Sequence, residues 1–131
     1  MIGERLLLDT NAIIQLLAGN AELIAIVEKA HFISTSVICE LEFLSFPGLS
    51  VEDAELYSRF RSRIHMFGLP ENDPQLIDQI CLLRVNSGLK LPDAIIAGTA
   101  IQNECHVVTA DAHFQRIMEP GRVLSYTPNR L

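Results

Sequence analysis

The sequence predicts an α/β protein, a three-layer α/β/α sandwich around a mostly parallel sheet of four to five strands. The run Leu6–Leu8 is apolar at every position, which is typical of a central parallel strand that is buried on both faces. Similar short apolar runs alternate with longer helical segments, and this order favours parallel strands joined by right-handed crossovers. At 131 residues the chain is long enough for a core of its own, so a single domain is expected over residues 1–131.

Helix-capping and helix-ending residues divide the chain into the predicted strands and helices. Gly19 is suited to ending the first helix in a left-handed conformation, and Asn20 is suited to capping the next one. Ser50, followed three residues later by Asp53, resembles a capping box at the start of a further helix. Strands are expected at residues 6–8, 32–35, 64–69, 106–109 and 123–125, and helices at 12–18, from 21, 36–46, 50–63, 74–88, 92–103 and after 111.

The helix predicted from residue 74 has the clearest boundaries. Asp73 is a cap followed by proline at the first helical position, and Gly88 marks the end. Spacing of its apolar residues predicts one buried face. That face consists of Leu76, Ile77, Ile80 and Leu83.

Composition excludes several classes of protein. Hydrophobic residues make up 49% of the chain and the mean hydropathy is +0.26, which excludes a disordered chain. No apolar run approaches the ~20 residues of a membrane span, and Glu4 and Arg5 come too early for a secretory signal. The cysteines Cys39, Cys81 and Cys105 are odd in number and lack metal-ligand spacing, so we interpret them as reduced core thiols of a cytoplasmic protein.

The net charge of −6 argues against a nucleic-acid partner, because affinity for phosphates normally comes from a basic face. This argument weakens if several of the 16 acidic residues form a metal site instead of open surface. Arg59, Arg61 and Arg63 form the one local basic cluster. At this spacing they do not share a helix stripe, so they are interpreted as a solvated helix face.

Some carboxylates lie within apolar sequence, at positions that a parallel sheet brings to one edge. Two directly follow predicted strands, one lies a turn into the helix after the second strand, and one lies in the first turn of a helix. Ligands of open α/β sheets bind at this edge. Structural roles stay open, because Asp9 and Asp111 could be helix N-caps and Asp93 could complement a helix dipole. The candidate site residues are Asp9, Glu40, Asp93 and Asp111.

Four carboxylates in a poorly hydrated cleft repel one another. At ~5 Å and an effective dielectric constant near 20, each ionised pair costs roughly 3 kcal/mol. No local Lys or Arg pairs with each of them, so either some are protonated or a hard divalent cation holds them together. Oxygen ligands favour magnesium or manganese over zinc. The residues therefore permit metal-assisted hydrolysis, which needs no side-chain nucleophile.

The motifs that contain these residues resemble those of a PIN-domain nuclease. They are Asp9-Thr10-Asn11, Glu40-Leu41, the segment Leu91–Ala97, and Thr109-x-Asp111-x-x-Phe114, in this order along nearly the whole chain. The compact length resembles the VapC toxin group. Two departures from the family pattern are visible. The family often has Gly a few residues after the Glu, where this chain has Phe43, Leu44 and Ser45, and an acidic residue is common where His113 stands.

The resemblance implies a PIN-like fold and Mg²⁺- or Mn²⁺-dependent cleavage of RNA phosphodiester bonds, leaving 5′-phosphate and 3′-hydroxyl ends. It also implies a cognate antitoxin as protein partner and a homodimer. Carried over by motif, the catalytic and metal-binding residues are Asp9, Glu40, Asp93 and Asp111, and the supporting residues are Thr10, Asn11 and Thr109.

Two other functions remain open at this stage. A phosphoreceiver domain also gathers acids around magnesium, but it usually shows an adjacent acidic pair after the first strand and a Lys after the last, and this chain has neither. A catalytically silent PIN-like interaction module would keep the fold without turnover.

The segment Val37–Leu49 has more apolar residues than one core-facing stripe requires, so it either is buried on both sides or forms a groove for a partner helix or a second copy.

Overall fold

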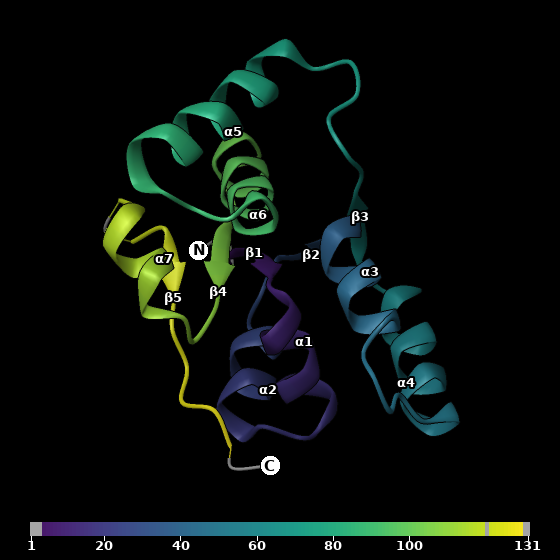
Figure 1. Ribbon diagram of the computed structural model, residues 1–131. Helices are drawn as coiled ribbons and strands as arrows, with labels where there is room; N and C mark the ends of the chain where they lie inside the picture. Colours follow the sequence, from purple (N-terminus) through teal and green to yellow (C-terminus); the bar gives the residue numbers. More distant parts are fainter. Residues whose placement is uncertain (1–3, 120, 130–131) are drawn as a thin grey trace.

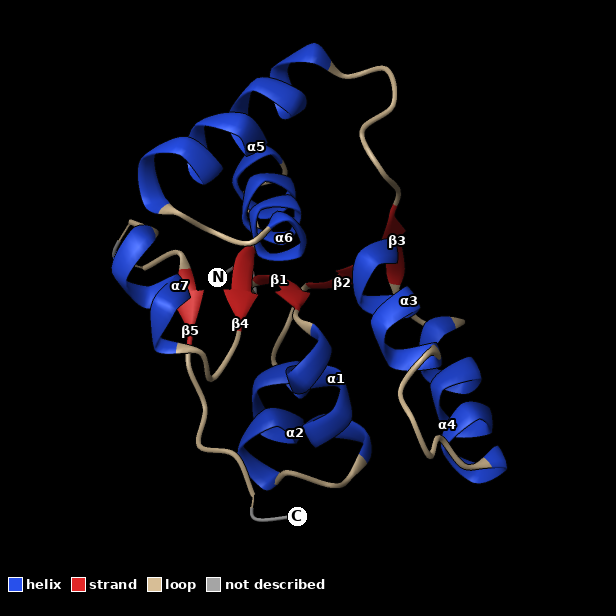
Figure 2. Cartoon of the chain, in the orientation of Figure 1, coloured by secondary structure: helices blue, strands red, loops and turns tan. Residues whose placement is uncertain are grey.

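A computed structural model describes residues 4–119 and 121–129, in which five strands form one parallel sheet. The strand order is β3-β2-β1-β4-β5, with the long apolar run at the centre (Figures 1 and 2). The predicted parallel α/β architecture is confirmed. The strands are β1 (Arg5–Leu8), β2 (Phe32–Ser36), β3 (His65–Phe67), β4 (His106–Val108) and β5 (Val123–Leu124).

Helices cover both faces of this sheet. Figure 1 shows α5 and α6 on one side and α1 and α2 on the other, with α3 and α4 beside the β3 end and α7 beside β5. Within the described residues, no single helix is long and apolar enough to cross a membrane; α1 and α2 meet the criterion only as a pair bent by 104°. The helices are α1 (Thr10–Leu17), α2 (Ala21–Glu28), α3 (Val37–Leu44), α4 (Val51–Arg61), α5 (Pro74–Ser87), α6 (Leu91–Gln102) and α7 (Ala112–Ile117).

The predicted helix caps are present. The side chain of Asn20 accepts a hydrogen bond from the Leu23 N–H at 3.0 Å, and Ser50 accepts one from the Asp53 N–H at 3.0 Å. Gly88 ends α5 in the left-handed region, with φ of 66°. The two side-chain caps fix the starts of α2 and α4 because they satisfy backbone N–H groups that have no partner within the helix.

Two expectations about buried residues are wrong. Ile77 is 42% exposed, whereas Leu76, Ile80 and Leu83 of the same helix are buried, with Leu76 and Ile80 beside Gly98 of α6. Cys81, also on α5, is exposed, whereas Cys39 and Cys105 are buried; all three thiols are free. The helix after β2 is also shorter than expected, since it ends at Leu44 instead of near Phe46.

The centre of the sheet is fully buried. Leu6, Leu7 and Leu8 have no exposed surface, as the unbroken apolar run predicts. Ser34 and Thr35 of β2 are equally buried, and their hydroxyls donate hydrogen bonds of 2.7 Å to the carbonyls of Leu6 and Leu8. Polar side chains fit into this central layer because their hydrogen-bonding groups are paired.

A substitution at Gly98 tests the close packing of α5 on α6. A Cβ atom at this position would lie 2.8 Å from the Cγ1 atom of Ile80, which is too close for ordinary contact. We expect Gly98→Ala to lower the free energy of unfolding by about 1–3 kcal/mol, the usual cost of overpacking a core. Urea denaturation measures this loss. Gly68→Ala is the control, because nothing lies within 4 Å of its Cβ position, and an equal loss in both variants would contradict the packing argument.

Candidate active site

The strand order reverses between β1 and β4, and candidate residues follow both strands. Asp9 comes directly after β1, is 7% exposed and caps α1 by accepting a 2.8 Å hydrogen bond from the Ala12 N–H. Asp111 follows β4, is exposed and caps α7 by accepting a 2.8 Å bond from the His113 N–H. Both residues therefore serve as helix caps, and both also face the edge of the sheet where ligands bind in open α/β folds.

Four carboxylates line one cleft of about 430 Å³ at this edge. Asp93 reaches it from the first turn of α6 and is half-buried. A fourth carboxylate comes from α3, and the remaining lining includes Asn11, Phe46 and Phe114. We call this space the acidic cleft. Its carboxylates are Asp9, Glu42, Asp93 and Asp111.

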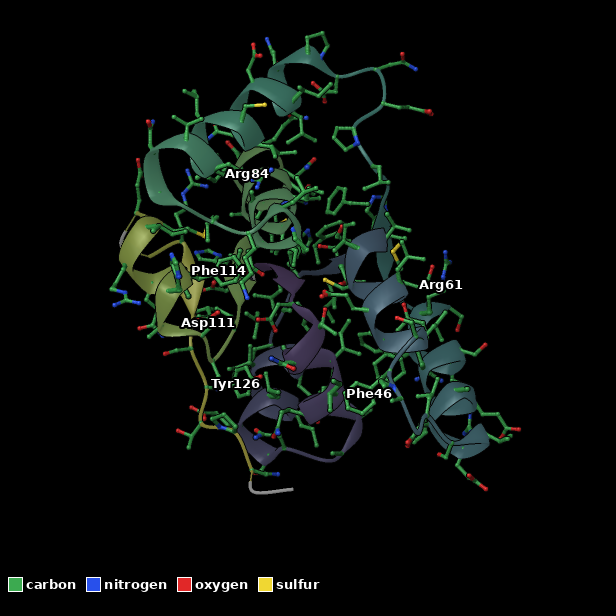
Figure 3. All side chains as sticks on the ribbon, viewed as in Figure 1. Phe46, Arg61, Arg84, Asp111, Phe114 and Tyr126 are labelled. Atoms are coloured by element: carbon green, nitrogen blue, oxygen red, sulfur yellow. The ribbon has the colours of Figure 1, made fainter. Side chains whose placement is uncertain are left out.

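The structure does not bring Glu40 to the acidic cleft, although the sequence suggested it. The Oε1 atom of Glu40 accepts hydrogen bonds from the Tyr57 hydroxyl at 3.0 Å and the Arg61 Nε at 2.7 Å. Both partners belong to α4, and Figure 3 shows Arg61 on the outer side of α3 and α4, away from Asp111. Glu40 therefore ties α3 to α4.

Glu42 occupies the place that was predicted for Glu40. Its Oε1 atom accepts a 2.6 Å hydrogen bond from the Thr10 hydroxyl, which fixes the side chain on the α1 side of α3. Glu42 also lies between apolar neighbours, Leu41 and Phe43, so the signal that selected Glu40 was present here as well. The apolar context and the Glu40-Leu41 motif both favour Glu40, but two residues along a helix point to nearly opposite sides, so only one of the two glutamates can face the cleft.

The predicted supporting residues surround the acidic cleft. Thr10 holds Glu42, and Asn11 lines the cleft. Thr109 is completely buried, and its hydroxyl accepts a 3.0 Å hydrogen bond from the Asp111 N–H. All three lie at the ends of β1 and β4, as the motifs suggested.

Comparison with known proteins identifies the family of this chain. A family model described as PIN domain matches residues 6–120. The chain belongs to the PIN domain family. No curated protein matches its sequence.

Several solved structures have folds similar to that of this PIN domain. A chain of a toxin-antitoxin complex from Klebsiella pneumoniae is 26% identical with a TM-score of 0.70, and the match covers 95% of this chain and 98% of that one. A chain of VapBC2 from Rickettsia felis, bound to a promoter DNA fragment, is 20% identical with a TM-score of 0.70 and coverages of 96% and 98%. A chain of DNA-bound VapBC from Salmonella typhimurium is 22% identical, also at 0.70, with coverages of 93% and 98%. The similarity extends over the whole PIN domain.

Electrostatics in this PIN domain oppose the ionisation of two site carboxylates. Burial raises the pKa of Asp9 to about 6 from 3.8, and the charges of Asp111 and Asp93 act in the same direction, against hydrogen bonds from Thr109 and Ala12. Burial also raises the pKa of Asp93, with further contributions from the charges of Asp111 and Glu42. Burial is the larger cause for both residues, and the neighbouring carboxylates add to it by repelling the charged form.

The donor set of the acidic cleft fits a hard divalent cation. Carboxylate and hydroxyl oxygens are the ligands that Mg²⁺ and Mn²⁺ prefer, and mutual repulsion is relieved when a cation binds. Within residues 4–119 and 121–129, no three acidic, His or Cys side chains already stand close enough together to hold an ion. The carboxylates line a common space, so they would hold such an ion together once their side chains turn toward it.

Proposed function

We propose that this protein is a Mg²⁺- or Mn²⁺-dependent endoribonuclease, the toxin of a VapBC-type toxin–antitoxin pair. The observation that carries the proposal is the convergence of four carboxylates in one cleft at the switch point of the sheet. Membership of the PIN domain family supports the reaction class. The 26%-identical chain from a toxin-antitoxin complex supports the biological role.

The proposed division of labour follows from the contacts. Asp9, Glu42, Asp93 and Asp111 hold the cation, with Glu42 in place of the predicted Glu40. Thr10 orients the Glu42 carboxylate, and the Thr109 hydroxyl holds the backbone of Asp111. A bound divalent cation activates water and stabilises the departing oxygen of the phosphodiester. Without a cation the carboxylates repel the anionic phosphate of the substrate, so a bound cation would supply the positive charge that the phosphate needs.

Incubation with labelled single-stranded RNA tests the reaction. We expect cleavage with Mg²⁺ or Mn²⁺ and none with EDTA, and products with 5′-phosphate and 3′-hydroxyl ends. Metal binding without cleavage of any RNA would favour the silent interaction module. Stable phosphorylation of Asp9 by a phosphodonor would favour the phosphoreceiver class.

An apolar groove beside the acidic cleft supports a protein partner. It has a volume of about 250 Å³ and lies between α1, the end of α3 and the start of α4, with lining from Ile14, Leu17, Phe43 and Leu49. Leu41 and Leu44 of α3 do not line the groove but are 56% and 48% exposed, so this helix offers further apolar surface to a partner. An amphipathic antitoxin helix fits such a groove with its apolar side chains. The predicted homodimer and cytoplasmic location remain part of this proposal.

A long charged side chain at Ala18 is expected to block the groove. Ala18 is exposed and lines the groove, so Ala18→Arg removes no core contact. We expect binding of the co-encoded antitoxin to weaken at least ~10-fold, with RNA cleavage retained, because an unpaired charge would be buried in the interface. Copurification and isothermal titration measure the loss. Phe43 is unsuitable for this test, since it is 5% exposed and stacks on Tyr57 at 4.7 Å.

Ala25→Arg is the matched control. Ala25 is an exposed alanine of α2 that does not line the groove. Equal antitoxin binding by the Ala18 and Ala25 variants would show that the partner docks elsewhere.

A further inference from the structure

The acidic cleft continues into a second space on the side of the C-terminal segment. This space has a volume of about 390 Å³, and we call it the tail lobe. It shares Asp9, Asn11, Phe46 and Asp111 with the acidic cleft, so the two spaces adjoin. Its own wall comes from Tyr126 and Pro128, which follow β5. In Figure 3, Tyr126 and Asp111 lie on the α7 side of α1, and Phe46 lies on the α3 side.

Buried amides hold the C-terminal segment against α1 and α2. Asn20 is 1% exposed, and its Nδ2 atom donates to the Thr127 carbonyl at 3.0 Å and to the Asn129 Oδ1 at 3.2 Å. Gln15 is 7% exposed and accepts a 2.8 Å bond from the Asn129 N–H. Glu22 accepts a 2.7 Å bond from the Thr127 N–H. The wall of the tail lobe is therefore fixed by specific hydrogen bonds.

The side chain of Tyr126, in this wall, has an unsatisfied hydrogen-bonding group. The residue is 6% exposed, and among the described residues its buried hydroxyl has no hydrogen-bond partner. Buried hydroxyls are normally paired, because an unsatisfied one is costly. Burial and the charge of Asp9 raise the pKa of Tyr126 to about 12, so the hydroxyl remains a donor. The hydroxyl has less than 1 Å² of accessible surface, so a ligand in the tail lobe would supply the missing acceptor once the Tyr126 ring turns toward it.

Phe46 presents an aromatic face at the junction of the two spaces. It is 57% exposed and lines the acidic cleft, the tail lobe and the apolar groove. The described contacts do not bury this ring, although it lies directly after the end of α3. Exposed aromatic side chains are typical platforms on which bases of single-stranded nucleic acid stack.

We propose that the tail lobe binds an unpaired nucleobase of the RNA, next to the phosphodiester that the acidic cleft holds. This proposal rests on the proposed function and adds a base-binding subsite to it. Phe46 stacks on the base, the Tyr126 ring turns so that its hydroxyl donates to the edge of the base, and Asn11, which is exposed, offers a second polar contact.

The charges of the two spaces favour a base over a phosphate in the tail lobe. The acidic cleft has four carboxylates and requires a cation to accept a phosphate, whereas the tail lobe has only Asp9 and Asp111, at the boundary. The other lining residues are aromatic, aliphatic or neutral amides. A planar, uncharged ring with polar edges matches these walls. A base that is paired within a duplex is not free to enter such a space, so the proposal requires a single-stranded nucleotide at this position.

An oligonucleotide with one abasic position tests the stacking contact. The abasic site is moved along a single-stranded RNA, next to the cleaved bond and away from it. For the wild type, we expect kcat/KM to fall roughly 5- to 150-fold only when the missing base adjoins that bond. Phe46→Ala should lose a similar factor on intact RNA and show little further loss on the abasic RNA. Leu44→Ala, an exposed apolar residue that does not line the tail lobe, should behave like the wild type.

Removal of the Tyr126 hydroxyl tests its contribution to RNA binding separately from any effect on folding. Because this hydroxyl has no partner, Tyr126→Phe should keep or raise Tm. We expect kcat/KM on intact RNA to fall roughly 2- to 12-fold, the value of one hydrogen bond. Unchanged cleavage by both Phe46→Ala and Tyr126→Phe would overturn the subsite. If Phe46→Ala instead abolishes antitoxin binding and leaves cleavage intact, the ring belongs to the protein interface.

Base stacking can also be measured without turnover. Single-stranded RNA with 2-aminopurine is titrated with the protein in EDTA and again with Mn²⁺, and stacking quenches its fluorescence. Quenching by the wild type and not by Phe46→Ala supports the subsite even if no RNA is cleaved, in which case the nuclease proposal fails alone. If the wild type cleaves RNA without quenching the fluorescence, and neither Phe46→Ala nor Tyr126→Phe changes the cleavage, the subsite is excluded. The nuclease proposal is then unaffected.

Discussion

Glu42→Gln is expected to lose at least ~100-fold in kcat/KM for RNA cleavage, with little change in fold. Substitution of residues that merely orient metal ligands typically costs 10- to 100-fold, so loss of a ligand itself should cost at least as much. Glu42 is exposed and its one described side-chain partner is the Thr10 hydroxyl, which the amide oxygen of Gln can still accept. Cleavage of labelled RNA and circular dichroism measure the two effects.

Glu40→Gln is the matched control, because the same chemical change is made two residues away on α3. Here the charged acceptor of Arg61 and Tyr57 is lost, so Tm should fall while cleavage by the folded protein persists. The reverse pattern, in which Glu40→Gln is inactive and Glu42→Gln active, would return Glu40 to the site and exclude Glu42.

Asp9→Asn is expected to stabilise the protein in EDTA at pH 7.5. The folded-state pKa of Asp9 is about 6, above the ordinary value of 3.8, so the folded state binds more protons than the unfolded state between these values. Stability is therefore lost as pH rises from about 4 to about 6, and at pH 7.5 the full cost of up to about 3 kcal/mol is present. Asparagine removes that charge and still caps α1 at the Ala12 N–H, since Asn and Asp are similar N-caps.

Addition of Mn²⁺ should make the wild type more stable than Asp9→Asn, the reverse of the order in EDTA. A cation at about a hundred times its Kd stabilises the wild type by roughly 2.7 kcal/mol, and a variant that has lost a ligand gains much less. Asp93→Asn should follow the same pattern, because burial and neighbouring carboxylates raise its pKa as well. Thermal melts of each protein with EDTA and with Mn²⁺ measure the crossover.

Asp73→Asn provides the control for helix capping. Asp73 caps α5 through the Leu76 N–H, as Asp9 caps α1, but it lies outside the acidic cleft. Hydrogen bonds from Gln102 and Leu76 lower the pKa of Asp73, so the charged form is favoured and its loss should destabilise the protein equally with and without metal. If Asp9→Asn also lowers Tm in both conditions, Asp9 is a cap and not a member of a repelling cluster.

Much of the fold could be predicted because its signals are local. The run Leu6–Leu8 identified the central strand, and Asn20, Ser50 and Gly88 marked helix ends in the conformations that the structure shows. Such signals depend on burial of consecutive side chains or on hydrogen bonds within a few residues. The convergence of Asp9, Asp93 and Asp111 could also be predicted, because the C-terminal ends of parallel strands meet at one edge.

The choice between Glu40 and Glu42 was decided by tertiary structure alone. Cys39 and Phe43 define the buried stripe of α3, and with about 100° per residue the two glutamates lie about 80° from its centre on opposite flanks. The helix is symmetric in this respect, so the sequence of α3 cannot say which flank faces the site.

Packing breaks that symmetry. The helix α4 lies on one flank of α3 and presents Tyr57 and Arg61 to Glu40, while α1 lies on the other and presents Thr10 to Glu42. In the same way, the tail lobe depends on contacts across more than a hundred positions, such as that between Asn20 and Asn129. Local sequence determines which residues form a helix or a cap, but the neighbour on each face of a helix is determined by long-range packing, and that neighbour decides which carboxylate reaches the acidic cleft.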